Sequence, residues 1–130
     1  MAEYLGKSEQ QKKRAYSPAV ITQGGKTVWL AGQTATVDEQ GNDISGNFEA
    51  QVKTIFSLLD KTLKQCGGSL ANMVTMTVFI VDPRHGDKFV DMRAGFFPSG
   101  NFPASALITV SNFARPGMLI EIQGVAVIGG

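Results

Sequence analysis

A single amphipathic helix pattern constrains the fold of this chain more than any other feature of its sequence. Across residues 48–66 the apolar side chains recur at steps of three and four, the spacing of one stripe along an α-helix. Asn47 or Ser45 can cap its start, and the glycines at 67–68 end it. Such a stripe has to be buried against another layer of the fold. Cys66 falls on the stripe, so we expect it to be a core thiol and not a nucleophile.

Two short apolar runs precede this helix, at residues 19–22 and 27–31. Gly24 and Gly25 lie between them, and paired glycines between two β-like runs are typical of a hairpin turn. The sequence therefore predicts that the two runs pair with each other. Residues 1–14 are polar and end in the only basic cluster of the chain, which is typical of a solvated N-terminal arm.

The segments after the long helix alternate between strand and helix patterns. Residues 73–81 predict a strand that is covered on both faces, and residues 87–97 predict a shorter second helix. Two further strands are expected at 104–110 and 118–128, paired antiparallel through the loop between them. The order ββ-α-β-α-ββ predicts a single α+β domain over residues 1–130, with two helices packed on one face of a mixed sheet. The other face needs a cover, so we expect oligomerisation.

Composition excludes several classes of function. The net charge is +1, with 12 basic and 11 acidic residues, so the chain lacks the basic footprint of a nucleic-acid-binding protein. No apolar run is long enough to cross a membrane. One cysteine and one histidine cannot form a disulfide within the chain or a zinc site, so we expect no metal and a cytoplasmic location. The histidine, His85, is expected to be an exposed turn residue.

One carboxylate stands out, because Glu121 lies in the middle of an otherwise apolar strand. In a partly buried pocket its pKa would rise toward neutrality, which suits a proton-transfer group; a structural glutamate bonded to backbone amides or to an arginine is the alternative. Ser105 and Leu107 share one face of the preceding strand, and antiparallel pairing would bring Ser105 close to Glu121. Ser105 has no neighbouring base, so we expect a hydrogen-bonding hydroxyl and not a nucleophile.

A further set of short motifs is spread from Ser17 to Ile128. In chain order these motifs are Ser17-Pro18, Leu30-Ala31-Gly32-Gln33, Cys66-Gly67-Gly68-Ser69-Leu70, Thr77-Val78-Phe79-Ile80-Val81-Asp82, Phe96-Phe97-Pro98, Phe102-Pro103-Ala104-Ser105, Ile120-Glu121-Ile122 and Val125-Ala126-Val127. In order and spacing the chain resembles the Rid (YjgF-like, endoribonuclease L-PSP) family. The resemblance implies a chorismate-mutase-like fold and a homotrimer with three pockets between subunits. It also implies cofactor-free hydrolysis of reactive enamines or imines of small 2-oxo acids to the ketone and ammonia.

At the pocket the resemblance is incomplete. Glu121 matches the glutamate of the family, and Gly32 matches the glycine whose backbone lines the pocket. Ser105 replaces the arginine that pairs bidentately with the substrate carboxylate, a task suited to a planar guanidinium. The other positions at which the family has a polar pocket residue are here apolar, namely Ala19, Ala31, Val90 and Leu107. Arg93 and Arg115 are the candidates to supply the missing cation; the alternative, which we favour for Arg115, is an ordinary surface arginine.

The sequence thus predicts a divergent Rid-type hydrolase or deaminase that acts on a small imine, enamine or related labile metabolite. Glu121 is the expected catalytic residue, and Gly32, Ser105, Leu107 and Arg93 are the expected substrate-binding residues. The alternative is a non-catalytic trimer that binds a small ligand or a protein partner. Cleavage of RNA is disfavoured, because the chain has neither a basic patch nor a pair of histidines.

Overall fold

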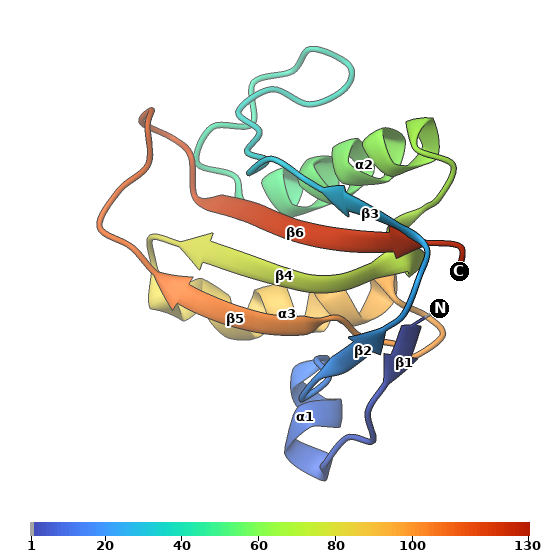
Figure 1. Cartoon of the computed structure of the whole chain (residues 1–130). Coiled ribbons are helices and arrows are strands. Elements are labelled where there is room, and N and C mark those ends of the chain that lie inside the picture. Colours follow the sequence, from blue (N-terminus) through green and yellow to red (C-terminus); the bar gives the residue numbers. More distant parts are fainter. Residues whose placement is uncertain (1) are drawn as a thin grey trace.

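A four-stranded sheet organises the chain, and two long helices cover one of its faces (Figure 1). In the computed structural model, which describes residues 2–130, the strands lie in the order β3 (Lys26–Trp29), β6 (Ile120–Ile128), β4 (Met73–Ile80) and β5 (Ala104–Thr109). β6 pairs antiparallel with β3 and with β4, whereas β4 and β5 are parallel. The fold is the predicted α+β arrangement with a mixed sheet.

The expected antiparallel pairing of the last two strands is wrong, because β4 lies between β5 and β6. A parallel pair needs a crossover connection, and the helix α3 (Gly86–Phe96) supplies one between β4 and β5. β6 then takes the other edge of β4. This places β6 inside the sheet, where Ile120, Ile122 and Ala126 are fully buried.

The long helix α2 (Phe48–Gln65) forms as its periodicity predicts. Asn47 caps it, since its side-chain oxygen accepts a hydrogen bond from the Ala50 N–H at 3.1 Å. The buried stripe packs on the sheet through Val52, Ile55, Phe56, Leu59 and Leu63. Cys66 is not a core thiol as expected: it lies at the C-terminal cap and is only partly buried, because the helix ends before the stripe completes another turn.

Two short 3₁₀ helices lead into β4 and α3, namely η1 (Leu70–Asn72) and η2 (Pro83–His85). Asp82 caps η2 by accepting a hydrogen bond from the Arg84 N–H at 2.9 Å, and Pro83 is its first residue, as its fixed φ favours. His85 is not the exposed turn residue that we expected. Its ring stacks on that of Phe48 with 4.2 Å between centroids, because η2 folds back onto the start of α2.

The predicted hairpin before α2 is also wrong. The strand β2 (Val20–Thr22) pairs with β1 (Ala2–Tyr4) in a separate two-stranded sheet, whereas β3 pairs with β6. Gly24 and Gly25 do turn the chain, with φ of 65° and 77°. Gly25 lies so close to the C-terminal end of β6 that an added Cβ would be 2.9 Å from the Gly129 carbonyl oxygen. This close approach carries β3 onto the edge of β6 and away from β2.

The polar N-terminal segment is folded against the rest of the chain. Its helix α1 (Glu9–Arg14) has a capping box, in which Ser8 accepts a hydrogen bond from the Gln11 N–H. The helix ends at Ala15, which is left-handed with φ 57° and 1% exposed. Ser17 then donates a hydrogen bond to the Phe102 carbonyl at 2.5 Å. These contacts bring the end of α1 to the start of β5.

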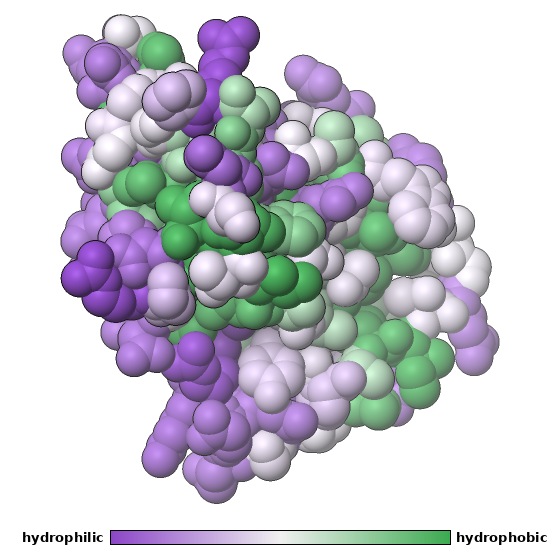
Figure 2. All heavy atoms as spheres, turned by 90° about the vertical axis from the view of Figure 1, so that its left-hand side faces the viewer, coloured by the Kyte–Doolittle hydropathy of each residue, from purple (hydrophilic) through white to green (hydrophobic). Residues whose placement is uncertain are grey.

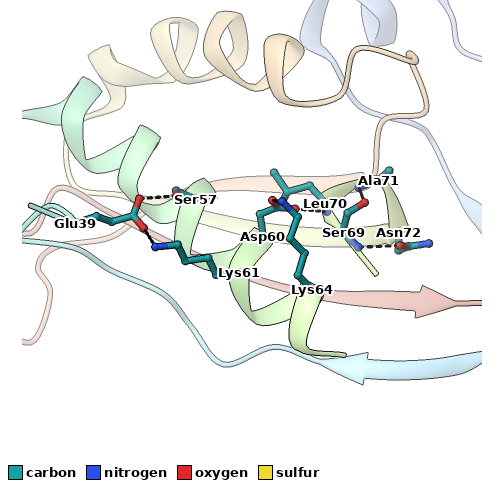
Figure 3. A network of polar contacts seen from close by, with 9 residues as sticks. All are labelled: Glu39, Ser57, Asp60, Lys61, Lys64, Ser69, Leu70, Ala71 and Asn72. Carbon is teal, nitrogen blue, oxygen red and sulfur yellow. Dashed lines mark hydrogen bonds and ion pairs between the residues drawn. The ribbon is translucent and has the colours of Figure 1, made fainter. Parts of the chain in front are cut away.

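Polar contacts on the exposed side of α2 hold the neighbouring loops (Figure 3). Ser57 donates a hydrogen bond to Glu39 at 2.6 Å, and Lys61 forms an ion pair with the same carboxylate. One turn further on, Asp60 accepts a hydrogen bond from the Leu70 N–H at 3.0 Å. Exposed ion pairs contribute little to stability, so these contacts mainly determine where the loop and η1 lie.

The face of the sheet opposite the helices is uncovered. Trp29 is 79% exposed on it, and Ile108 is 42% exposed. A view from the end where β4 and β5 stop also shows a hydrophobic patch bordered by hydrophilic residues (Figure 2). Contiguous apolar surface of this kind is typical of an interaction site.

Within residues 2–130, no helix combines the length and the hydropathy that a membrane span requires.

Candidate functional site

The predicted site residues form two groups on opposite faces of the sheet. Ser105 pairs with Met76, whose side chain lies buried beneath the helices. Glu121 pairs with Phe79, which is three residues further along β4 and therefore points to the uncovered face. The expectation that Ser105 and Glu121 are neighbours is wrong within one chain, because β4 separates their strands and their side chains point in opposite directions.

The first group surrounds a cavity of about 220 Å³ between α1, α3 and β5. We call it the Arg93 pocket, and its walls are formed by Arg14, Tyr16, Val90, Arg93, Ser105 and Leu107. Three of the predicted substrate-binding residues, Ser105, Leu107 and Arg93, are thus brought together. Arg115 is exposed in the loop after β5 and does not line the cavity.

Arg93 is the most buried charged residue of this pocket, at 2% exposure. Its Nη1 donates a hydrogen bond to Ser105 Oγ at 2.6 Å, and its Nη2 donates to the Arg14 carbonyl at 2.9 Å. The guanidinium carbon lies 5.0 Å from the centroid of the Phe89 ring, within the range of a cation–π contact. The Nε atom is buried and has no acceptor among the described residues.

The charge of Arg93 is not neutralised within residues 2–130, where no carboxylate forms an ion pair with it. Burial, and secondarily the charge of Arg14, lower the pKa of Arg93 to about 10, so the guanidinium remains charged at neutral pH. A buried cation without a counterion is costly. A guanidinium also has more N–H donors than these two hydrogen bonds use. The arrangement is chemically suited to an anion, because a guanidinium with unused donors can form charge-assisted hydrogen bonds with a carboxylate.

Ser105 acquires a clear role in this geometry. By the resemblance it stands where the family has an arginine, and here its hydroxyl accepts a hydrogen bond from Arg93, which extends from α3. Val90 and Leu107 give the pocket apolar walls, as their replacement of polar residues implies. Arg14 and Tyr16 were missed by the sequence analysis: Arg14 ends the segment 1–14 that was expected to be a solvated arm, and Tyr16 follows that segment and was not singled out. The sequence signal that could have found them is the neighbouring Ser17-Pro18 motif, which follows Tyr16 and leads the chain to β5.

The second group consists of Glu121 and Gly32, which lie side by side. A Cβ added to Gly32 would collide with the Glu121 carboxylate. The residues that follow Gly32 and Glu121 hold this arrangement, since the Gln33 N–H donates to the Ile122 carbonyl at 2.8 Å and the Ile122 N–H donates to the Gln33 carbonyl at 3.1 Å. Glu121 itself is only partly buried, and its carboxylate forms no hydrogen bond or ion pair with residues 2–130. It is thus free of the backbone contacts that a structural glutamate would have.

Comparison with known proteins agrees with this architecture. The endoribonuclease L-PSP family matches residues 7–128. The chain belongs to this family, also called Rid. A RutC family protein of Pyrococcus abyssi is 27% identical over 111 residues, which are 85% of this chain and 84% of that protein. Protein DfrA of Myxococcus xanthus is 29% identical over 112 residues, which are 86% and 84% of the two chains.

The Rid fold is equally clear from structure alone. A crystal structure of the Rid family protein YyfB from Yersinia pestis superposes with a TM-score of 0.86 over 98% of both chains, at 22% sequence identity. At that identity the likeness shows the fold and nothing about the reaction. The predicted chorismate-mutase-like α+β fold is confirmed.

Proposed function

We propose that this Rid protein hydrolyses a small imine or enamine that carries a carboxylate, releasing ammonia and a 2-oxo acid. In this proposal the reaction takes place in clefts between the subunits of a homotrimer. Arg93 binds the carboxylate, Ser105 positions Arg93, and Glu121 of a neighbouring subunit handles the proton.

The observation that supports this function is the buried, uncompensated charge of Arg93. A protein that needed only a stable core would gain by replacing such a cation with an apolar residue. Keeping it inside a cavity of about 220 Å³ is reasonable only if an anion of small size binds there. A carboxylate could accept hydrogen bonds from more than one N–H group of the guanidinium, while Val90 and Leu107 contact the carbon chain of the ligand.

A second copy is needed because Glu121 and Arg93 lie on opposite faces of the sheet in one chain. The uncovered face carries Glu121 together with the exposed Trp29 and Ile108. Packing this face against a neighbour would bury these apolar side chains and could bring one subunit's Glu121 to the other's Arg93 pocket. Residues from two subunits would then complete each site.

Hydrolysis of the imine requires the protein to position the substrate and to supply one group that carries a proton. Water adds across the C=N bond, with its oxygen on carbon and a proton on nitrogen, which gives a carbinolamine. The hydroxyl proton of the carbinolamine then passes to the amine nitrogen, the C–N bond breaks, ammonia leaves, and the carbon becomes the carbonyl of the 2-oxo acid. An enamine enters the same sequence after it tautomerises to the imine, with one proton moving from nitrogen to carbon. Glu121 takes the proton from the attacking water and returns it to the nitrogen. Arg93 holds the neighbouring carboxylate in place throughout.

The test is ammonia release from imines generated in situ by an amino-acid oxidase, with and without this protein. We expect the wild-type chain to accelerate release and Glu121→Ala to abolish the acceleration. Gln123→Ala is the matched control, because Gln123 is exposed on the same face of the same strand. It should keep the wild-type rate.

Two outcomes would argue against a hydrolase. If wild type and Glu121→Ala both match the blank across several amino-acid-derived imines, the catalytic proposal fails. Binding of a 2-oxo acid to the Arg93 pocket in the same preparation would then favour the non-catalytic ligand-binding alternative. The assembly is measured separately by sedimentation, where a monomer at working concentration would contradict sites shared between subunits.

A further inference from the structure

Arg14 is a second cation at the Arg93 pocket that the proposed reaction does not use, and its charge acts on Arg93. Arg14 ends α1 and lines the cavity together with Arg93. Its backbone carbonyl accepts the hydrogen bond from Arg93 Nη2, so the two residues are in contact at one wall of the pocket. A single carboxylate on Arg93 would leave the charge of Arg14 without a role in binding.

We infer that Arg14 is a second anion-binding group and that the pocket takes diacids, namely imines or 2-oxo acids with a further carboxylate on the side chain. This inference deepens the proposed function and depends on it, because Arg93 has to bind the first carboxylate. Arg14 then determines specificity by binding the second.

The present partner of Arg14 is easily displaced. Its Nη1 pairs with Asp87 at 2.6 Å, but the Asp87 side chain is 89% exposed and that of Arg14 is 33% exposed. An ion pair in such contact with water contributes little and is screened by salt. A ligand whose first carboxylate is bound by Arg93 has its second carboxylate at a high effective concentration next to Arg14. This second carboxylate would therefore compete well with Asp87.

The charges and the size of the cavity agree with a short diacid. The positive charge of Arg14 reaches Arg93, where it adds to the effect of burial in lowering the pKa of that residue. A dianion would relieve this repulsion, whereas a monoanion would neutralise only one of the two cations. The cavity of about 220 Å³ is below the roughly 300–1,000 Å³ that drug-sized ligands occupy, so the diacid has to be small.

The walls between the two cations suit the carbon chain of such a molecule. Val90 and Leu107 are apolar, and Tyr16 contributes a phenol at the same wall. Among the residues that line the cavity there is no carboxylate to repel a dianion. Asp87 belongs to the first turn of α3 and pairs with Arg14 from outside this set.

The test compares two 2-oxo acids of equal length by calorimetry, 2-oxoglutarate and 2-oxopentanoate. They differ in the terminal carboxylate alone. We expect wild type to bind 2-oxoglutarate more tightly by about 10-fold or more, and Arg14→Gln to remove that difference by weakening 2-oxoglutarate binding far more than 2-oxopentanoate binding. Lys13→Gln is the matched control: Lys13 precedes Arg14, is exposed, and carries the same charge. It should keep the preference.

A gain of affinity gives the sharper readout, because damage to the fold would not produce it. Asp87→Asn frees Arg14 and should strengthen 2-oxoglutarate binding several-fold with no effect on 2-oxopentanoate. Asp91→Asn, with the same charge change one helical turn away on α3, should have no such effect. Equal gains in both variants would indicate a general effect of net charge and would overturn the role of Arg14.

Two further results distinguish the role of Arg14 from the anion-binding role of Arg93. If wild type binds both acids equally well, the second anion site is wrong and the proposed function stands. If wild type binds neither acid, the anion-binding role of Arg93 fails, and the diacid specificity fails with it.

Discussion

The Arg93 pocket and the Glu121–Gly32 pair differ in how the fold holds their charges. Arg93 is fixed within one chain: it is 2% exposed, bonded to Ser105 and Arg14, and packed on Phe89. The Glu121 carboxylate is partly buried and has no hydrogen bond or ion pair within residues 2–130. The cation is therefore held in place within one chain, whereas the carboxylate has no such contacts among the described residues, and in the proposed assembly a neighbouring subunit supplies them. Substitutions at the Arg93 pocket and at the Glu121–Gly32 pair test this difference.

The largest effect is expected from Arg93→Met. Removing the cation should weaken 2-oxo acid binding by about 100-fold or more, since a desolvated charge pair is worth roughly 2–5 kcal/mol when one partner is truncated. The thermal midpoint should hold or rise, because a buried unpaired charge is lost at the same time. Calorimetry and thermal unfolding measure the two quantities. A large fall in thermal midpoint with unchanged affinity would mean that Arg93 is structural.

Trp29→Glu addresses the other side of the comparison. A charge at a 79% exposed position should leave the subunit folded but prevent burial of the open face. We expect sedimentation to show a monomer and imine hydrolysis to fall by about 100-fold, because Glu121 no longer meets an Arg93 pocket. Thr22→Glu, an exposed residue of the separate two-stranded sheet, is the control. Full activity from a Trp29→Glu monomer would refute sites shared between subunits.

Gly32→Ala should act only on the carboxylate. The added methyl group would push Glu121 aside, and a misplacement of about 1 Å can cost about 100-fold in rate. We therefore expect kcat to fall by about 10- to 100-fold with KM nearly unchanged, because Arg93 is untouched. Gly95→Ala provides the control, since its site has open space and no positive φ. A rise in KM with unchanged kcat would place Gly32 in ground-state binding instead.

The smallest effect is expected from Ser17→Ala, which tests how the N-terminal segment holds Tyr16 and Arg14 in the pocket. Ser17 is buried, and loss of its hydrogen bond leaves the partly buried Phe102 carbonyl without this donor. The free energy of unfolding should fall by about 1–2 kcal/mol, as measured by urea denaturation. Ser111→Ala, at an exposed loop position, should change it little. An unchanged stability would show that the segment is held by other contacts.

Local periodicity predicted the elements of this fold better than their partners. α2, β4 and α3 lie close to their expected positions, because each carries a strong apolar pattern of its own. Strand pairing failed twice, since sequence neighbours were assumed to be sheet neighbours: β2 pairs with β1, and β4 separates β5 from β6. Pairing depends on where a crossover helix and a close glycine contact carry the chain, and neither is a local property.

The sequence by itself determined the Rid family, the α+β class and the candidates for the site, including Arg93 as a replacement for the arginine absent at position 105. Only the tertiary structure decided which candidates meet. It brought Arg93 to Ser105, added Arg14 and Tyr16, and separated all of them from Glu121 by the thickness of the sheet. The reason is physical: alternation along a strand assigns a side chain to one of two faces, and only the packing of helices on one face reveals which of the two is buried.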